Sequence, residues 1–258
     1  MKKTIKDKIS DKLVNAFVKN KIISAIPSKY TKKLTEADKF RKLCESKIKD
    51  PIIGFKAGGT GIPLMKKLKE KEPFIASVFK KNLIKSGKKV KINKSTLGIE
   101  LEVCYLIKKN FFSSKGKITN KNVTKYISHM APCIEVVGYR QKRKGITSFG
   151  DLSSDFGGNI KFLIGQKKKF KKINIGNLKT IIANKRAKQS VNGNTSAVYL
   201  NPINSLRFDL NKVKQDKTKL EKDFYVFTGS TVGVVPILKK GMYSAKIEKL
   251  GSVKANII

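Results

Sequence analysis

The succession of short apolar runs along the chain constrains its fold more than any other feature. From about residue 73 onward, runs rich in β-branched and aromatic residues alternate with turn residues such as glycine, proline and asparagine. This pattern predicts short β-strands. The predicted strands are FIASVF, KVKI, GIELEVCYLI, CIEVVGY, IKFLIG, LKTIIAN, TSAVYL, DFYVFTG, VGVVPIL, YSAKIEKL and SVKANII. Most of the chain is therefore expected to lie in β-sheets.

The first part of the chain has a helical period instead. Apolar residues recur on one face of residues 4–23, which predicts an amphipathic helix. A second helix is predicted to start at Thr35, which makes a capping-box pattern with Asp38, and to stop at Pro51. The run IIGFKAGGTG at 52–61 predicts a strand that leads into a glycine-rich turn.

Three further helices are predicted, at 63–71, 118–130 and 201–218. A helical first part followed by a strand-rich part with a few helices indicates an α+β fold. The length of 258 residues suits one large domain or a domain with a smaller attachment. The predicted organisation is an N-terminal helical segment at 1–50 and a β-rich catalytic domain at 51–258.

Cysteine usage and the N-terminal sequence indicate the compartment. Cys44, Cys104 and Cys133 are odd in number, unclustered and set in apolar surroundings. Buried thiols in a reducing cytoplasm explain this better than disulfides or a zinc site. The start, MKKTIKDKISDKLVNAFVKNKII, is interrupted by charges every few residues, so neither a secretory signal nor a membrane span is expected. We expect a cytoplasmic protein without a membrane partner.

The formal net charge of +40 raises the question of nucleic acid as a partner. Almost all of the basic residues are lysines, and they are spread along the whole chain. Nucleic-acid sites usually use the planar guanidinium of arginine. The chain has five arginines, namely Arg41, Arg140, Arg143, Arg186 and Arg207. The pattern favours a solvated lysine surface over a nucleic-acid site, with attraction of an anionic substrate as a by-product.

Two glutamates interrupt the apolar strand LGIELEVCYLI. Side chains of a strand alternate between its faces, so Glu100 and Glu102 share a face with Gly98 and Cys104. This face could simply be exposed to solvent, as in many antiparallel sheets. A second apolar strand, APCIEVVGYR, carries Glu135.

Three buried carboxylates that converge would require a cation, because an unpaired buried charge is expensive. An all-oxygen set suits Mg²⁺ or Mn²⁺ rather than zinc. His129 is the single histidine of the chain, and we assign it no role.

The order of motifs resembles the 2-keto-4-pentenoate hydratase group of the fumarylacetoacetate hydrolase superfamily. This group also contains 2-oxo-hepta-3-ene-dioate hydratases and oxalocrotonate decarboxylases. The resemblance is collinear over nearly the whole chain. It is carried by IPSKYTKKLTEADKF, GFKAGGT, LGIELEVCYLI, APCIEVVGYR, DFGGNIKFLIG, GNTSAVYLNPINSL and FTGSTVGVVPILKKGMYSAKIEKLGSVKANI.

The resemblance implies a mixed β-sandwich or roll of the fumarylacetoacetate hydrolase type, after an N-terminal helical segment. It also implies that Glu100, Glu102 and Glu135 hold Mg²⁺ or Mn²⁺, which binds a 2-oxo acid. The implied activity is a hydratase that adds water to a 2-oxo-alkenoate and yields a 4-hydroxy-2-oxo acid. A homo-oligomer is implied as well.

Further site residues follow from the same resemblance. Lys56 matches a lysine of the family and could hold the substrate carboxylate or act in proton transfer, with an ordinary surface lysine as the alternative. Asp155 matches a second catalytic position. Thr228 and Ser230 match a segment that meets a substrate oxygen, although turn capping is an alternative for these residues and for Asp155. The predicted substrate-binding set is completed by Thr60 and Arg140.

Some family positions are altered. Lys71 and Phe74 replace two aspartates, and the segments 58–61, 138–140 and 155–159 have lost polar residues. The reaction could therefore be decarboxylation or acylpyruvate C–C hydrolysis, or the chain could be a diverged member with weak or no activity. A basic binding protein for nucleic acid is the non-enzymatic alternative, which the dispersed lysines disfavour.

Overall fold

The computed structural model describes residues 3–142 and 145–258. The chain begins with helix α1 (Ile5–Lys19), where the Thr4 hydroxyl accepts a hydrogen bond from the backbone N–H of Asp7. Helix α2 (Leu34–Ser46) follows. The predicted capping box at Thr35 is wrong, because the helix begins one residue earlier and Lys33, at its N-cap, makes no side-chain bond. Both predicted helices are otherwise confirmed.

The larger of the two sheets has strand order β2-β1-β11-β5-β6-β7-β3, and β8 pairs with β6. Its strands are β1 (Ile52–Gly58), β2 (Phe74–Phe79), β3 (Leu83–Lys85), β5 (Thr96–Ile107), β6 (Ile127–Gly138), β7 (Asn159–Ile164), β8 (Lys168–Lys169) and β11 (Phe224–Ser230). The long central strands β5 and β6 form its antiparallel middle. The smaller sheet has the order β10-β9-β12-β13-β4. Its strands are β4 (Lys89–Val90), β9 (Lys179–Asn184), β10 (Gln189–Asn194), β12 (Gly241–Ile247) and β13 (Gly251–Ile257).

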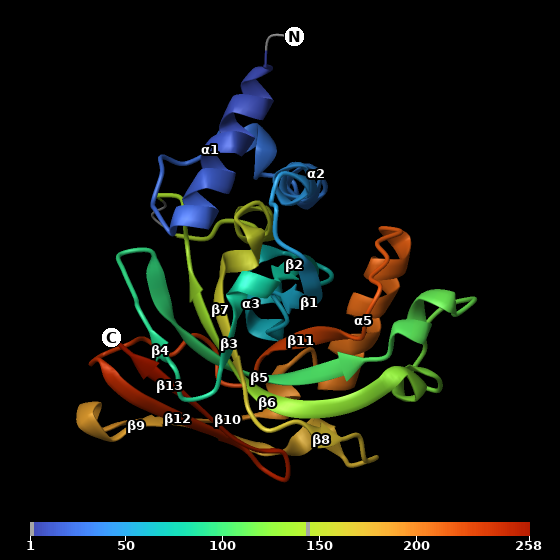
Figure 1. Cartoon of the computed structure of the whole chain (residues 1–258). Coiled ribbons are helices and arrows are strands. Elements are labelled where there is room, and N and C mark those ends of the chain that lie inside the picture. Colours follow the sequence, from blue (N-terminus) through green and yellow to red (C-terminus); the bar gives the residue numbers. More distant parts are fainter. Residues whose placement is uncertain (1–2, 143–144) are drawn as a thin grey trace.

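The smaller sheet lies against one face of the larger sheet (Figure 1). Alternate residues of β5, such as Leu101 and Val103, pack in one hydrophobic core with Tyr243 and Val253 of the smaller sheet. Helix α5 (Pro202–Gln215) contributes to the same core and packs on β11 and β1. The glutamates of β5 point to its opposite face. Because side chains of a strand alternate between faces, the core residues and the site residues of β5 lie on different sides of the sheet.

The other helical elements are short. They are α3 (Ile62–Leu68), α4 (Phe149–Ser153) and the 3₁₀ turns η1 (Ser28–Tyr30), η2 (Lys80–Asn82), η3 (Lys109–Ser113), η4 (Val123–Tyr126), η5 (Phe156–Gly158), η6 (Ile175–Asn177), η7 (Lys185–Ala187) and η8 (Thr195–Ala197). Helix α3 overlaps the helix predicted for 63–71, but it begins one residue earlier and ends at Leu68.

Two sequence predictions are wrong for reasons of tertiary structure. The segment 118–130 is not one α-helix, because it contains only the short 3₁₀ turn η4 and its last residues, such as Ile127 and Met130, pair with β5 at the start of strand β6. TSAVYL is not a strand, because Asn194 caps the turn η8 and Tyr199 and Leu200 have positive φ angles. VGVVPIL contributes one bridge, between Val235 and Ile99.

The N-terminal helices pack on the β-rich part of the chain. Leu13, Phe17 and Phe40 form a buried cluster with Phe79 of β2 and Phe156 of η5. Beside this cluster, the buried carboxylate of Glu45 accepts hydrogen bonds from Arg41 and from the backbone N–H and hydroxyl of Ser77. The helical character of 1–50 is confirmed, whereas the domain boundary near residue 50 stays a prediction.

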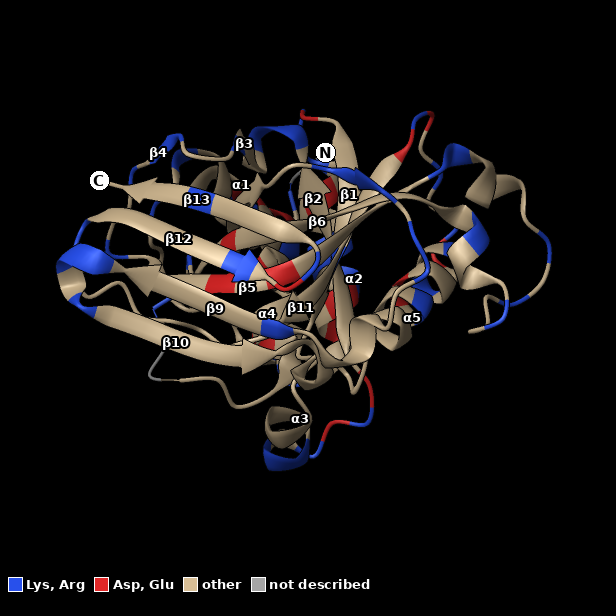
Figure 2. Ribbon diagram, turned by 90° about the horizontal axis from the view of Figure 1, so that it is seen from below, with Lys and Arg blue, Asp and Glu red and all other residues tan. Residues whose placement is uncertain are grey.

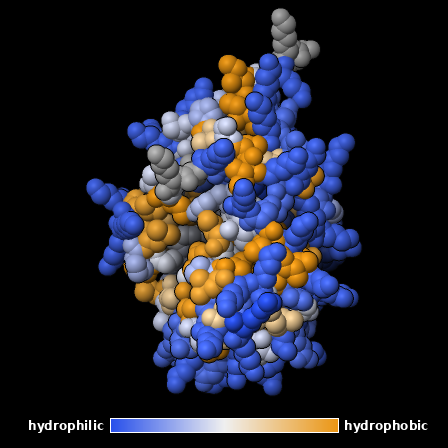
Figure 3. Space-filling view, turned by 90° about the vertical axis from the view of Figure 1, so that its left-hand side faces the viewer, coloured by the Kyte–Doolittle hydropathy of each residue, from blue (hydrophilic) through white to orange (hydrophobic). Residues whose placement is uncertain are grey.

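The surface carries the lysine charge on all sides. Basic residues are scattered over loops and strand ends (Figure 2). The space-filling view of one side shows hydrophobic surface gathered in a band across a largely hydrophilic face (Figure 3). All three cysteines are buried and unpaired, as predicted. Within the described ranges, every helix is too short or too polar to cross a lipid bilayer.

Candidate metal centre

Three glutamates converge on the face of the larger sheet that points away from the smaller one. Glu100 of β5 lies directly opposite Glu135 of β6, and Glu102 lies opposite Cys133 in the same register. Because residues two apart on a strand share a face, all three carboxylates point the same way. One oxygen of each lies within 4.8 Å of the others.

The position of this cluster excludes a simple solvent face. Glu102 and Glu135 are completely buried, and Glu100 is half-buried at the edge of a cavity. Beside them on the same face, Cys104 and Cys133 pack in an apolar cluster with Phe162 and Phe227. The carboxylates therefore lie at the inner end of the cavity with a hydrophobic group to one side.

Burial makes ionisation of these glutamates costly. It raises the pKa of Glu100 to about 7 and that of Glu102 well above the usual range, where the charge of Glu135 adds to the effect. Burial also raises the pKa of Glu135, although the ammonium of Lys56 opposes this. Without a cation, the three carboxyl groups cannot all be ionised cheaply at neutral pH.

Lys56 is the cation that the chain itself supplies to the cluster. Its Nζ donates to both carboxylate oxygens of Glu135, at 3.0 and 2.8 Å, and to the carbonyl oxygen of Gly157 at 3.2 Å. Burial disfavours its charge, but the carboxylates of Glu135, Glu100 and Glu102 outweigh that cost and raise the pKa of Lys56. Lys56 therefore stays protonated and neutralises one of the three carboxylates.

Glu102 has one carboxylate oxygen without a partner. Its Oε2 accepts a hydrogen bond from the backbone N–H of Gly229 at 3.1 Å, whereas its buried Oε1 has no hydrogen-bond partner among the described residues. A buried carboxylate oxygen is normally paired or bound to a metal. With Lys56 counted, the ionised cluster carries two net negative charges. The donor set thus fits a divalent cation that prefers oxygen ligands.

A cavity of about 590 Å³ opens above the cluster. Of the predicted site residues, Lys56, Glu100, Thr60 and Ser230 line it. Thr228 does not, because it is buried and its hydroxyl donates to the carbonyl oxygen of Val103 at 3.0 Å. The structure therefore places four predicted residues around one space and Thr228 in the wall behind it.

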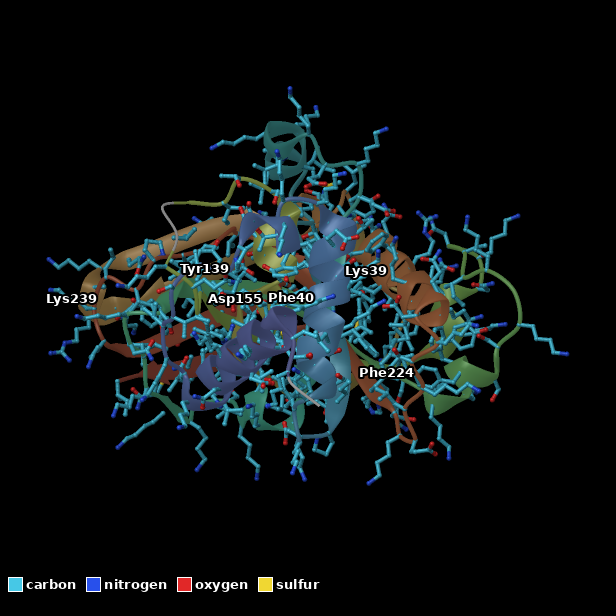
Figure 4. The ribbon with its side chains drawn as sticks, turned by 90° about the horizontal axis from the view of Figure 1, so that it is seen from above. Lys39, Phe40, Tyr139, Asp155, Phe224 and Lys239 are labelled. Carbon is cyan, nitrogen blue, oxygen red and sulfur yellow. The ribbon has the colours of Figure 1, made fainter. Side chains whose placement is uncertain are left out.

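Asp155 and Arg140 also lie outside the cavity lining. Their side chains form a buried ion pair at 3.2 Å, and Asp155 Oδ2 accepts a hydrogen bond from the backbone N–H of Arg140 at 2.7 Å. Arg140 also donates to the carbonyl of Asn159. Seen from above, Asp155 lies in the interior, whereas Lys239 lies at an outer edge (Figure 4). The pair stabilises the turn whose Gly157 carbonyl accepts a hydrogen bond from Lys56. The catalytic role predicted for Asp155 and the substrate-binding role predicted for Arg140 stay predictions.

Sequence reasoning missed two backbone groups of the site. The carbonyl of Gly157 and the N–H of Gly229 contact Lys56 and Glu102, respectively. The backbone at Phe156, Gly157 and Gly158 has three consecutive positive φ angles of 53°, 69° and 74°. The adjacent glycines were a signal for such a turn, but nothing in the sequence indicated which side chain it would meet.

Comparisons with known proteins identify the fold. No protein-family model matches the chain, and no curated protein sequence matches it. Among solved structures, 4-oxalocrotonate decarboxylase from Pseudomonas putida G7, complexed with magnesium and adipate, aligns with a TM-score of 0.83 at 18% identity over 97% of this chain and 96% of its own. The α+β fold of the fumarylacetoacetate hydrolase type is therefore confirmed.

Two further structures share the core of this fold. Fumarylpyruvate hydrolase from Pseudomonas aeruginosa, in complex with Mn²⁺ and pyruvate, has a TM-score of 0.58 at 12% identity over 81% of this chain and 91% of its own. The 5-carboxymethyl-2-hydroxymuconate delta-isomerase from Mycobacterium smegmatis has a TM-score of 0.56 at 14% identity over 81% of this chain and 80% of its own. The fold thus serves several reactions, which leaves the activity to the site.

Proposed function

We propose that this chain is a metal-dependent enzyme of the fumarylacetoacetate hydrolase superfamily that acts on a 2-oxo acid. Glu100, Glu102 and Glu135 would hold Mg²⁺ or Mn²⁺. The observation that carries the proposal is the buried triad with one unpartnered oxygen on Glu102, next to a cavity large enough for a small molecule. Structures of this fold that are complexed with magnesium, or with Mn²⁺ and pyruvate, support it.

The residues around the triad suit a 2-oxo acid. When bound, the cation supplies a Lewis acid that stabilises negative charge on the 2-oxo group. Lys56 keeps its proton and lies at the cavity wall, where it can attract the substrate carboxylate or pass a proton. The hydroxyls of Thr60 and Ser230 reach the same cavity and can meet a substrate oxygen.

Within this class we propose a hydratase that adds water to a 2-oxo-alkenoate of the 2-keto-4-pentenoate type. The collinear motifs support this choice. Decarboxylation of a related 2-oxo acid and C–C hydrolysis of an acylpyruvate are the alternatives, because chelation of a 2-oxo acid is common to all three. Cytoplasmic location and a homo-oligomer belong to the same proposal.

Metal analysis of purified variants tests the centre. We expect about one Mg²⁺ or Mn²⁺ per chain in the wild type and at least about tenfold weaker binding in Glu102→Gln and Glu100→Gln. Glu221→Gln changes an exposed glutamate elsewhere and is the matched control. Equal metal content and equal turnover in all four proteins would disprove the proposal.

The reaction is tested by product analysis on a panel of 2-oxo acids with the metal-loaded chain. Hydration adds the mass of water to a 2-oxo-alkenoate, whereas decarboxylation releases CO₂ and hydrolysis yields two acids. Release of CO₂ or of two acids, with no hydration of the alkenoate, would replace the hydratase by the corresponding alternative.

A further inference from the structure

The mouth of the cavity carries exposed apolar side chains from three separate segments. They are Leu97 at the start of β5, Leu200 in the loop before α5 and Val234 in the loop after β11, which are 46%, 67% and 50% exposed. Single exposed hydrophobic residues are common, but these three line the same cavity. A shared position at a binding cavity requires a functional explanation.

The cavity is also depleted of the charge that covers the rest of the molecule. Among the described residues that line it, Lys56 is the only cationic side chain, and it is bound to Glu135 at the metal centre. In a chain with a formal net charge of +40, the described part of this wall is a local exception, since it contains no other lysine. A ligand with a second carboxylate at its far end would therefore have no described cationic side chain to pair with.

The size of the cavity indicates a substrate that extends beyond the 2-oxo acid group held at the metal centre. About 590 Å³ falls within the range of about 300–1,000 Å³ of pockets that enclose drug-sized ligands. A five-carbon 2-oxo acid would fill only part of this space. The remaining wall is formed largely by apolar side chains, among them Ile62, Leu64, Phe74 and Leu152.

The backbone fixes the position of the most exposed of the three side chains. Tyr199 and Leu200 both have positive φ angles, of 46° and 66°, which residues with a side chain adopt rarely. The backbone N–H of Tyr199 donates to the carbonyl oxygen of Thr60 at 2.9 Å and so ties this loop to the cavity wall. Strained backbone that a hydrogen bond maintains is typical of functional sites.

We propose that Leu97, Leu200 and Val234 form an apolar rim that selects 2-oxo acids with an uncharged hydrophobic tail and discriminates against dicarboxylates. This inference rests on the proposed function, because the metal centre is taken to hold the 2-oxo acid end. The rim contacts the tail and acts on the specificity of binding.

The test compares two ligands of equal length that differ only at the far end. The full chain, loaded with Mg²⁺, is titrated with 2-oxohexanoate and with 2-oxohexanedioate in a calorimeter. We expect the monocarboxylate to bind at least about tenfold more tightly, because the rim buries its apolar tail. A terminal carboxylate at the rim would lose part of its hydration and meet no other cationic side chain among the described lining residues. Pyruvate is titrated as well and reports on the metal centre without a tail.

Substitution of the rim gives the second arm. Leu200→Lys is expected to weaken binding of 2-oxohexanoate and to strengthen binding of 2-oxohexanedioate, so that the ratio falls by about tenfold or more. Val234→Lys should act in the same direction from another segment. Leu238→Lys is the control, because Leu238 is 62% exposed and lies outside the cavity lining.

The outcomes separate this inference from the proposed function. Pyruvate binding without a preference between the two longer acids, or with a preference for the dicarboxylate, overturns the rim and leaves the metal centre intact. If pyruvate fails to bind the metal-loaded chain, the proposed function fails as well. Rim variants that alter the sedimentation of the protein but not the ligand ratio would show a contact between copies, and the proposal would be wrong.

Discussion

Lys56 and Glu135 form a buried ion pair in the middle of an acidic cluster. Pairs of this kind contribute little net stability when intact, because both charges have lost their hydration. They become expensive when one partner is removed. At this position the lysine also limits the repulsion among three carboxylates. Lys56 therefore has a structural role that does not depend on a role in catalysis.

Replacement of Lys56 tests that structural role. In metal-free protein, Lys56→Met is expected to lower the free energy of unfolding by about 3–5 kcal/mol, because Glu135 is left buried without its cation. Urea unfolding in the presence of a chelator measures this. The control Lys212→Met removes the exposed pair with Glu72 and should cost about 0–1 kcal/mol. Similar losses in the two variants would contradict the assignment.

Asp209 is a second buried carboxyl group, and neither of its oxygens has a hydrogen-bond partner among the described residues. Burial raises its pKa well above the usual range, although Lys56 opposes this. The folded chain therefore keeps this group protonated at pH values where the unfolded chain has released the proton. Because the unfolded state then binds fewer protons, Asp209 lowers stability progressively as pH rises above the ordinary aspartate pKa of 3.8.

Asp209→Leu should therefore stabilise the protein. The gain over wild type is expected to grow by about 1.4 kcal/mol for each pH unit above the ordinary pKa, until the raised pKa of the folded state is reached. Unfolding curves between pH 5 and 8 measure it. Asp209→Asn is the matched control, since it removes the ionisation but retains a polar group. Stability curves of wild type and Asp209→Leu that run parallel with pH would refute this account.

At the scale of elements, the site depends on strand register and on tight backbone turns. The alternation in LGIELEVCYLI predicts that Glu100 and Glu102 share a face, and the structure confirms it. Glu135 lies opposite Glu100 because of the register in which β5 and β6 pair. The sequence of the two strands is compatible with more than one such register. The strand β6 itself begins inside the predicted helix 118–130, because pairing with β5 overrides the local helical pattern.

Strand β11 supplies the clearest test at this scale. Gly229 has a φ angle of 100°, and a β-carbon there would lie 2.0 Å from the Thr60 hydroxyl oxygen. Gly229→Ala should lower the free energy of unfolding by about 1–3 kcal/mol and weaken metal binding, because its N–H holds Glu102.

Gly87→Ala is the control for that substitution, since Gly87 also has a positive φ angle but faces open space. Thermal unfolding and metal titration compare the two variants. Unchanged metal affinity in Gly229→Ala would show that Gly229 does not contribute to metal binding.

At the scale of the whole molecule, the N-terminal helices and the sheets share buried contacts. The cluster of Leu13, Phe17 and Phe40 reaches Phe79 and Phe156, next to the turn that presents Gly157 to Lys56. The N-terminal helices therefore pack next to the site. The residues of this cluster are buried only because the helices and the β-rich part of the chain cover one another.

Removal of residues 1–50 should consequently prevent stable folding of the remainder. The fragment 51–258 would expose Phe79 and Phe156 and would lose the hydrogen bonds between Glu45 and Ser77. We expect broad, uncooperative unfolding by circular dichroism and rapid proteolysis. A fragment that unfolds cooperatively and resists protease would instead establish an independent domain beginning near residue 51.

The sequence by itself determined the β-rich class, the helical N-terminal segment, the buried cysteines and the shared face of Glu100 and Glu102. These features depend on local periodicity and composition, which can be read from short stretches of consecutive residues. The family resemblance implied that Glu135 joins the other two glutamates, but only the tertiary structure decided the register that brings them together and that Asp155 lies outside the cavity lining. It also decided that Leu97, Leu200 and Val234 share one cavity. Register and loop packing set these contacts between distant residues, and no short stretch of sequence contains them.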